Sequence, residues 1–392
     1  MSASDELLIT VSGKDSPGIT ARLTGVLAQH GAEVLDIDQV VLHGRLTLCL
    51  RVAMPTTHGA LRDLLVEAKA LGVSLDLEPL QAPDAHAHAG KRWVVTAIAQ
   101  KISTTDLHRL ASTLAEHGAN VEKASRLSED GLSSLELRVR LSPEGDPGAL
   151  KRALLALSME STFDVALQPE SLYRRSKRLV VMDMDSTLIR IEVIDELARA
   201  AGVVERVSQI TERAMQGELD FDASLRERVA LLEGLEVSVL ERLARELPLT
   251  DGAERLIRVL KRLGFRTAVL SGGFSIAAEA LQARLGIDYA FSNTLEVEHG
   301  RLTGKVLGPI VNAERKAELL ASIAEQEGIL LDQVIAVGDG ANDLMMLEKA
   351  GLGIAFRAKP KLREAADTSI SRSGLDAILY LLGISGRELR EA

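Results

Sequence analysis

The chain has 392 residues, and at roughly 150 residues per domain this length predicts two or three domains rather than a single core. Hydrophobic residues make up 46% and charged residues 26% of the chain, which is typical of a folded protein and excludes collagen-like and disordered classes. The formal net charge of −10 argues against sequence-independent binding of nucleic acid, and the single cysteine, Cys49, excludes an intramolecular disulfide bond and a multi-cysteine zinc site.

The amino-terminal residues show no targeting signal. Residues Met1–Glu6 contain neither a basic segment nor the start of an apolar one. No apolar run in the chain approaches the roughly 18 residues that a membrane-spanning helix needs. We therefore expect a cytoplasmic protein with no membrane partner and no nucleic-acid partner.

A short repeat divides the first part of the chain. Residues Ala28–Val34 (AQHGAEV) recur as Ala115–Val121 (AEHGANV), with five of seven positions identical at an offset of 87 residues. Because this offset is the size of a small domain, we predict two related domains over residues 1–80 and 91–170, joined by a polar linker.

Both copies have the same order of predicted elements. The first has strands over 7–11, 33–42, 45–53 and 73–77 and helices over 18–30 and 59–71. The second has strands over 93–99, 121–127, 135–141 and 163–167, a helix that carries Leu107, Leu110 and Leu114, and a helix over 148–157. The order β-α-β-β-α-β predicts a ferredoxin-like fold for each copy.

The pattern changes after about residue 171, where apolar strands begin to alternate with helices. The predicted strands are 179–182, 267–270, 334–337 and 352–356, and helices are predicted over 276–285 and 342–350. This order is typical of an α/β domain with a doubly wound, mostly parallel sheet, here over 176–392. A long helical stretch between the first two strands predicts a cap over about 191–250.

Reactive side chains follow several of these strands, and in open α/β sheets ligands bind at the carboxyl ends of the strands. The strand-end residues are Asp183 and Asp185 after the first strand, Ser271 and Gly272 after the second, and Asp339, Asn342 and Asp343 after the third. Lys316 lies early in a helical stretch between the second and third strands.

These residue types suit phosphoryl transfer. Two carboxylates separated by one residue repel each other unless they share a cation or a proton, and Mg²⁺ prefers oxygen ligands. The turn at Ser271 offers a hydroxyl and main-chain N–H groups to an anion, and Lys316 supplies a positive charge. The set therefore predicts Mg²⁺-assisted phosphoryl transfer.

In this order, the segments Asp183-x-Asp185-x-Thr187, Ser271-Gly272, Lys316 and Gly338–Asp343 (GDGAND) resemble the four motifs of the haloacid dehalogenase superfamily of phosphatases. The resemblance implies that Asp183 is a nucleophile that becomes an aspartyl-phosphate and that Asp185 is the acid and base. It implies that Ser271 and Lys316 hold phosphoryl oxygens. It also implies that Asp183, Asp339 and the main-chain carbonyl of Asp185 bind Mg²⁺, with Asp343 supporting them.

The cap segment is similar to that of the phosphoserine phosphatases within this superfamily. There Glu192 would pair with the substrate ammonium and Arg228 with its carboxylate, while Met215 and Phe221 would cover the site and exclude water. The substrate contacts implied by the resemblance are Glu192, Met215, Phe221, Arg228, Ser271, Gly272, Lys316 and Asn342.

The two amino-terminal repeats resemble ACT domains, which sense small molecules. The loop Asp15–Gly18 matches the ligand loop of that family, so the resemblance implies an amino-acid site at Asp15 and Gly18, with serine as the effector, and a homodimer formed through these domains. The second copy has Lys101–His108 in place of this loop, and its ability to bind a ligand stays open.

The resemblance as a whole implies a Mg²⁺-dependent enzyme that hydrolyses O-phospho-L-serine, the last step of serine biosynthesis, with feedback by serine. Two alternatives stay open. An aspartyl-phosphate could be transferred to homoserine or another alcohol instead of water, or the protein could be a catalytically inactive amino-acid sensor. The intact Asp183, Lys316 and Asp339 argue against the inactive sensor.

Overall fold

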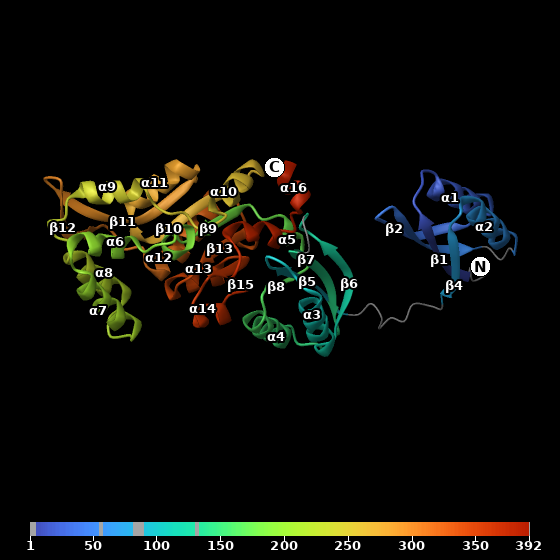
Figure 1. Cartoon of the computed structure of the whole chain (residues 1–392), viewed down its shortest axis with the longest axis horizontal. Helices are drawn as coiled ribbons and strands as arrows, with labels where there is room; N and C mark the ends of the chain where they lie inside the picture. The colour runs from blue at the N-terminus through green and yellow to red at the C-terminus, as the bar shows by residue number, and fades with distance from the viewer. Residues whose placement is uncertain (1–4, 55–57, 81–89, 130–132, 392) are drawn as a thin grey trace. The chain divides into compact units, whose positions relative to one another are not determined.

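The computed structural model describes residues 5–54, 58–80, 90–129 and 133–391 and divides into two compact units, Met1–Ala89 and Gly90–Ala392 (Figure 1). The predicted linker falls almost entirely outside the described residues. Within the described residues, no helix is both long enough and apolar enough to cross a membrane.

The first unit is an antiparallel sheet with two helices packed against it. Its elements are β1 (Asp5–Lys14), α1 (Ile19–Gln29), β2 (Glu33–Leu42), β3 (Arg45–Met54), α2 (His58–Leu71) and β4 (Ser74–Leu80). The strand order β2-β3-β1-β4 is that of the predicted ferredoxin-like fold. In β3 the even-numbered residues are buried and the odd-numbered ones are not, because successive side chains of a strand point to opposite faces.

The second repeat has the same elements but belongs to the second unit. They are β5 (Lys91–Ile98), α3 (Thr104–Glu116), β6 (Ala119–Arg126), β7 (Ser134–Leu141), α4 (Pro147–Glu160) and β8 (Asp164–Pro169). Ser103 and Asp106 form a capping box at the start of α3, and Asp146 caps α4, which begins with a proline. These local signals fix where both helices begin.

The catalytic part of the second unit is built on five parallel strands: β9 (Leu179–Met182), β10 (Arg266–Phe274), β13 (Val334–Gly338), β14 (Leu352–Phe356) and β15 (Thr368–Ile370). Strand β9 lies between β10 and β13. Val180 and Met182 of β9 pack into the core on one face of the sheet, and Leu179 and Val181 pack into the core on the other. Burial on both faces explains why this strand is a continuous apolar run.

Helices and one hairpin complete this part of the chain. The helices outside the cap are α5 (Leu172–Arg175), α10 (Ala253–Arg262), α11 (Ser275–Leu285), α12 (Ala313–Gln326), α13 (Leu344–Lys349), α14 (Pro360–Ala365), α15 (Ile378–Leu381) and α16 (Gly386–Glu391). The hairpin of β11 (Tyr289–Glu298) and β12 (Arg301–Leu307) extends the sheet beyond β10 and was not predicted from the sequence.

The cap consists of four helices, α6 (Val193–Ala201), α7 (Val204–Met215), α8 (Phe221–Ala230) and α9 (Val237–Arg245). Figure 1 shows these helices together at one end of the second unit, beside the β11–β12 hairpin. The helical pattern over 193–247 thus corresponds to short helices rather than to one long element.

The sheet of the second repeat continues into the catalytic sheet. Strand β8 pairs with β15 through Thr368 and Ala166, which gives one sheet of eleven strands in the order β12-β11-β10-β9-β13-β14-β15-β8-β5-β7-β6. From the sequence, these two regions are predicted to form separate sheets. The connection was not predicted because it depends on the three-residue strand β15, which is too short to show a pattern.

Buried polar contacts hold this joint between the second repeat and the catalytic part. The guanidinium of Arg174 donates to the carboxylate of Glu136 at 2.6 Å, and their side chains are only 5% and 4% exposed. The carboxylate of Asp164 accepts from the main-chain N–H groups of Ser371 and Arg372, both at 3.0 Å. The second repeat is therefore fixed to the catalytic part by a paired charge and by hydrogen bonds, in addition to the strand pairing.

Candidate active site

The carboxyl ends of β9, β10 and β13 bring the predicted strand-end residues together. The main-chain N–H of Asp183, directly after β9, donates to the carbonyl of Val337 in β13 at 2.9 Å, so the loop that carries Asp339 lies beside Asp183. Asp185 follows in the turn Met184–Leu188, and its carboxylate accepts a long hydrogen bond from Ser271 of β10 at 3.4 Å.

Three carboxylates meet at this edge of the sheet. Oxygens of Asp183, Asp339 and Asp343 lie within 4.8 Å of one another. Asp343 accepts from the main-chain N–H groups of Asp339 and Gly340 at 3.1 and 3.0 Å, so it holds the loop in place. The hydroxyl of Thr187 donates to Asp339 at 2.9 Å. Asp183 and Asp339 therefore have more oxygens available for a ligand than Asp343 has.

Lys316 is completely buried in the first turn of α12 and links two of these carboxylates. Its ammonium lies 2.9 Å from Asp183 and 2.7 Å from Asp343. Burial alone would lower the pKa of Lys316, but attraction by both carboxylates outweighs burial and holds that pKa above its usual value. The lysine is therefore a permanent positive charge at the site.

The carboxylates at this site carry more negative charge than Lys316 neutralises. Burial, followed by repulsion from Asp343, raises the pKa of Asp183 well above its usual value and that of Asp339 to about 6. Burial and the nearby Glu192 raise the pKa of Asp185 to about 7. A set of clustered carboxylate oxygens that one lysine does not neutralise fits a divalent cation with oxygen ligands.

Gly272 and Gly273, which follow Ser271, allow the ring of Phe221 and the carboxylate of Asp185 to lie close to the main chain. A Cβ atom at Gly273 would lie 2.4 Å from a carboxylate oxygen of Asp185, and one at Gly272 would lie 2.7 Å from the ring of Phe221 in the cap. The main-chain N–H of Gly273 also donates to the Ser271 hydroxyl at 2.8 Å. Side chains at either position would push the acid or the cap away from the strand end.

The cap brings further predicted residues over the cluster. Glu192 lies directly before α6, where its carboxylate accepts from the Ser186 hydroxyl at 2.7 Å. Burial lowers the pKa of Arg228 in α8. Attraction by the carboxylates of Glu192, Asp195 and Asp185 opposes this shift only in part. In the described part of the chain, Arg228 forms no ion pair, so its guanidinium remains available for an anion. The side chain of Met215 lies outside the described residues.

Two asparagines that were not identified from the sequence support the site. Buried Asn293 donates to the carbonyl of Gly272 and accepts from the N–H of Val311, both at 2.8 Å. Asn312 caps the helix that carries Lys316, and its amide also donates to Asp222 of the cap at 3.2 Å. An asparagine four residues before a buried lysine was a usable helix-start signal, whereas Asn293 lies in the unpredicted hairpin.

The other predicted residues lie at the edge of this site or outside it. Asn342 is half-buried in the short helical turn Ala341–Asp343, between Asp339 and the end of that turn. Asp15 and Gly18 belong to the first unit, where both are exposed and Gly18 adopts a left-handed conformation with φ of 98° before α1. The main-chain N–H of Asp15 donates to the carbonyl of Gly44 at 2.9 Å.

Comparison with known families identifies three regions. Residues 177–351 match the model of haloacid dehalogenase-like hydrolases, and residues 5–78 and 92–168 each match an ACT domain model. The resemblances predicted from the motifs and from the repeat are thereby confirmed.

Relatives of similar length exist in two bacteria. The phosphoserine phosphatase of Streptomyces coelicolor is 44% identical over 98% of this chain and 94% of its own length. Phosphoserine phosphatase SerB2 of Mycobacterium tuberculosis is 44% identical over 100% of this chain and 96% of its own length. A solved phosphoserine phosphatase with an analogue of a phospho-aspartyl intermediate is 49% identical, with a TM-score of 0.50 over 52% of this chain and 98% of that one.

Proposed function

The chain belongs to the phosphoserine phosphatase family of haloacid dehalogenase-like hydrolases, and we propose that it hydrolyses O-phospho-L-serine to L-serine and phosphate at the Asp183 cluster. The observation that carries this proposal is the buried contact of Asp183 with Lys316, next to an Asp185 whose pKa of about 7 suits an acid that works near neutral pH.

In the first step, a carboxylate oxygen of Asp183 attacks the phosphorus of the substrate and forms an aspartyl-phosphate. The bond between phosphorus and the serine oxygen breaks, and the protonated carboxyl of Asp185 gives its proton to that oxygen. Lys316 and the hydroxyl of Ser271 hold the phosphoryl oxygens during the transfer.

In the second step, Asp185 is ionised and takes a proton from a water molecule that attacks the phosphorus. The bond between phosphorus and the Asp183 carboxylate breaks, which releases phosphate and restores both aspartates to their starting states. Closure of the cap by Phe221 over Gly272 limits the entry of other water molecules.

The donor set supports Mg²⁺ as the metal. Asp183, Asp339 and the main-chain carbonyl of Asp185 would hold it, while Asp343 is already engaged by Lys316 and by two main-chain N–H groups. When bound, the ion supplies positive charge to the phosphoryl oxygens.

Glu192 and Arg228 are the proposed recognition groups for the serine part of the substrate. Replacement of Glu192 with Gln should raise KM for phosphoserine by about ten-fold, a loss of about 1.4 kcal/mol, because the substrate ammonium loses its charged partner. KM for phosphoglycolate, which has no ammonium, should change little. Glu205→Gln, at an exposed position of α7, is the matched control and should behave like the unmodified protein.

The direct test of the proposed function is steady-state hydrolysis of phosphoserine with Mg²⁺ and after its removal by EDTA. We expect turnover that stops with EDTA and returns with added Mg²⁺. Absence of turnover with Mg²⁺ would favour the inactive sensor. A second arm with homoserine present detects phosphohomoserine, which would instead indicate phosphotransfer.

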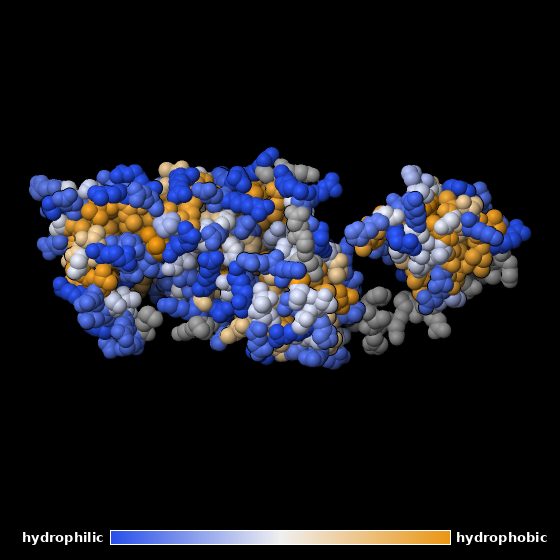
Figure 2. Space-filling view, viewed as in Figure 1, coloured by the Kyte–Doolittle hydropathy of each residue, from blue (hydrophilic) through white to orange (hydrophobic). Residues whose placement is uncertain are grey.

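We further propose that serine binds the first unit at the Asp15–Gly18 loop and that the chain forms a homodimer through its ACT domains. The exposed end of helix α1 at Gly18 supports an amino-acid carboxylate site. Edge strand β2 supports pairing, because it is exposed along its whole length. Figure 2 shows apolar side chains on the surface of this unit, and the exposed ones include Val34, Ile37, Val40 and Leu42.

Serine inhibition curves test this regulation. Gly18→Ala should weaken inhibition, because a side chain disfavours the left-handed conformation at that position. Gly25→Ala is the control within α1, where an added Cβ meets no atom within 4 Å. Equal inhibition of both variants would contradict the assignment of the loop. Light scattering measures the oligomeric state.

A further inference from the structure

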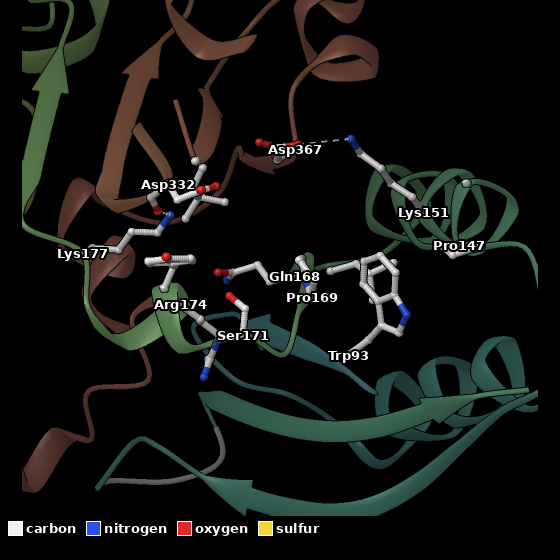
Figure 3. A pocket seen from close by; sticks show the side chains of 15 residues that line it. Trp93, Pro147, Lys151, Gln168, Pro169, Ser171, Arg174, Lys177, Asp332 and Asp367 are labelled. Carbon is white, nitrogen blue, oxygen red and sulfur yellow. Dashed lines mark hydrogen bonds and ion pairs between the residues drawn. The ribbon is translucent and has the colours of Figure 1, made fainter. Parts of the chain in front are cut away.

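A cavity of about 360 Å³ lies at the joint between the second repeat and the catalytic part. It is lined by Trp93 of β5, the first turn of α4 and the end of β8 on one side, and by residues next to the amino ends of β9, β13, β14 and β15 on the other. Figure 3 shows these side chains around the opening between the two parts. The cavity is therefore at the opposite edge of the sheet from the candidate active site.

Lys177 is a buried cation of this cavity that has no ion-pair partner among the described residues. The residue is 6% exposed, and its ammonium donates to the main-chain carbonyl of Asp332 at 2.6 Å. Among the described residues it forms no ion pair, so two of its three N–H donors have no protein acceptor. Burial lowers the pKa of Lys177 to about 8, despite attraction by Asp332 and Asp367. A buried ammonium in this state favours an anionic ligand.

The other walls limit the kind of anion. Lys151 of α4 lies 3.9 Å from Asp367 (Figure 3), so these two charges offset each other. The carboxylate of Asp332 would repel a dianion such as phosphate. Apolar groups of Trp93, Leu167 and Pro169 form the remaining wall, and the positive end of the α4 dipole adds to the attraction for one negative charge.

We propose that this cavity binds a small monocarboxylate with a flat apolar body. Its carboxylate accepts hydrogen bonds from Lys177, and its apolar part packs against Trp93 and Pro169. This site differs from the loop at Asp15 in position and in the charge that it offers.

The placement of Lys177 connects the cavity to the catalytic strands. Lys177 lies two residues before β9, which leads to Asp183, and it bonds to the residue two before β13, which leads to Asp339. The main-chain N–H of Arg178 also donates to the carbonyl of Gln333 at 2.8 Å. A ligand on Lys177 would therefore lie next to the starts of both strands whose ends carry the carboxylate cluster.

The full chain contains its own reporter for this site, because Trp93 is its single tryptophan. The probes are 3-phenylpropionate, its neutral isostere 3-phenylpropanamide, and 2-phenylethylammonium, which carries the opposite charge. We expect a saturable change in tryptophan fluorescence with the carboxylate, and binding at least about ten-fold weaker for the other two probes. Absence of a saturable change at millimolar carboxylate, or equal binding of the amide, would overturn the proposal.

Variants of Lys177 test whether its ammonium binds the carboxylate of the ligand. Lys177→Met should weaken binding of the carboxylate by about ten-fold or more, and Lys177→Arg should restore most of it because the charge is kept. Lys101→Met, at an exposed position of the second repeat that does not line the cavity, should bind as tightly as the unmodified protein. Unchanged affinity in Lys177→Met, or loss in Lys101→Met, would refute the assignment. If Lys177→Met does not fold, the comparison of probes on the unmodified protein decides.

Discussion

The Glu136–Arg174 pair at the joint and the active site both bury charged side chains, but only the pair balances them. At the joint, Glu136 and Arg174 form a close pair with both side chains about 95% buried. At the active site, the carboxylates of Asp183, Asp339 and Asp343 cluster together, and the buried Lys316 pairs with only Asp183 and Asp343. A balanced buried charge thus fixes structure, whereas an unbalanced one raises carboxylate pKa values and leaves oxygens that suit a metal ion.

Replacement of the proposed nucleophile should remove activity without loss of stability. Asp183→Asn removes the proposed nucleophile, so kcat should fall by at least about 10⁴-fold, or about 5.5 kcal/mol in activation free energy. The free energy of unfolding should stay the same or rise, because one of several clustered negative charges is lost. Phosphoserine hydrolysis and urea denaturation measure the two quantities. Full activity of this variant would contradict the assigned role.

The matching change at the joint should lower the stability of the fold and leave catalysis unchanged. Arg174→Met leaves Glu136 buried without its closest partner and should lower the free energy of unfolding by about 3 to 5 kcal/mol. The lower end is expected, because Arg138 and Arg175 lie 3.8 and 3.9 Å from Glu136. The kcat of the folded variant should be unchanged.

A double variant provides the control at the joint. Replacement of both Glu136 and Arg174 by apolar residues, Glu136→Leu with Arg174→Met, should recover part of the lost stability because no charge is left unpaired. A double variant less stable than Arg174→Met alone would show that the pair itself, rather than the unpaired charge, determines stability.

Mg²⁺ should stabilise the protein through the active site and not through the joint. At a concentration 100 times its Kd, an ion that binds only the folded state adds about 2.7 kcal/mol. This gain should persist in Arg174→Met and be much smaller in Asp339→Asn, which loses a proposed ligand. Thermal unfolding with and without Mg²⁺ measures it, and an equal gain in Asp339→Asn would exclude that residue as a ligand.

The smallest effect concerns an ion pair that is not buried. Arg51 lies 2.6 Å from Glu6 in the first unit, with both side chains roughly one-third exposed. Arg51→Met should therefore change the free energy of unfolding by about 0 to 1 kcal/mol, because water screens such pairs. A loss as large as that of Arg174→Met would show that burial does not decide the contribution of these pairs.

The sequence predicted the parts of the site that follow from local order along the chain. Asp183, Ser271 and Asp339 each follow an apolar strand directly, so their meeting at one edge followed from the parallel sheet. Asn293 could not be predicted, because its role depends on the position of the β11–β12 hairpin. The joint could not be predicted either, because Asp164 and its partners are 207 and 208 residues apart and no local pattern connects them.

The connection of β8 to β15 also affects how the protein is made. All four catalytic motifs lie before residue 344, yet the second repeat docks on Ser371, Arg372 and the carbonyl of Leu381. At 5–20 residues per second, a ribosome needs about 10 to 40 s to travel from Asp164 to Ser371. During that time the second repeat has been synthesised and β8 can pair with β5, but β15, the partner for its other edge, is missing. The final segment of the chain thus contributes no catalytic motif, and its synthesis determines when the joint can close.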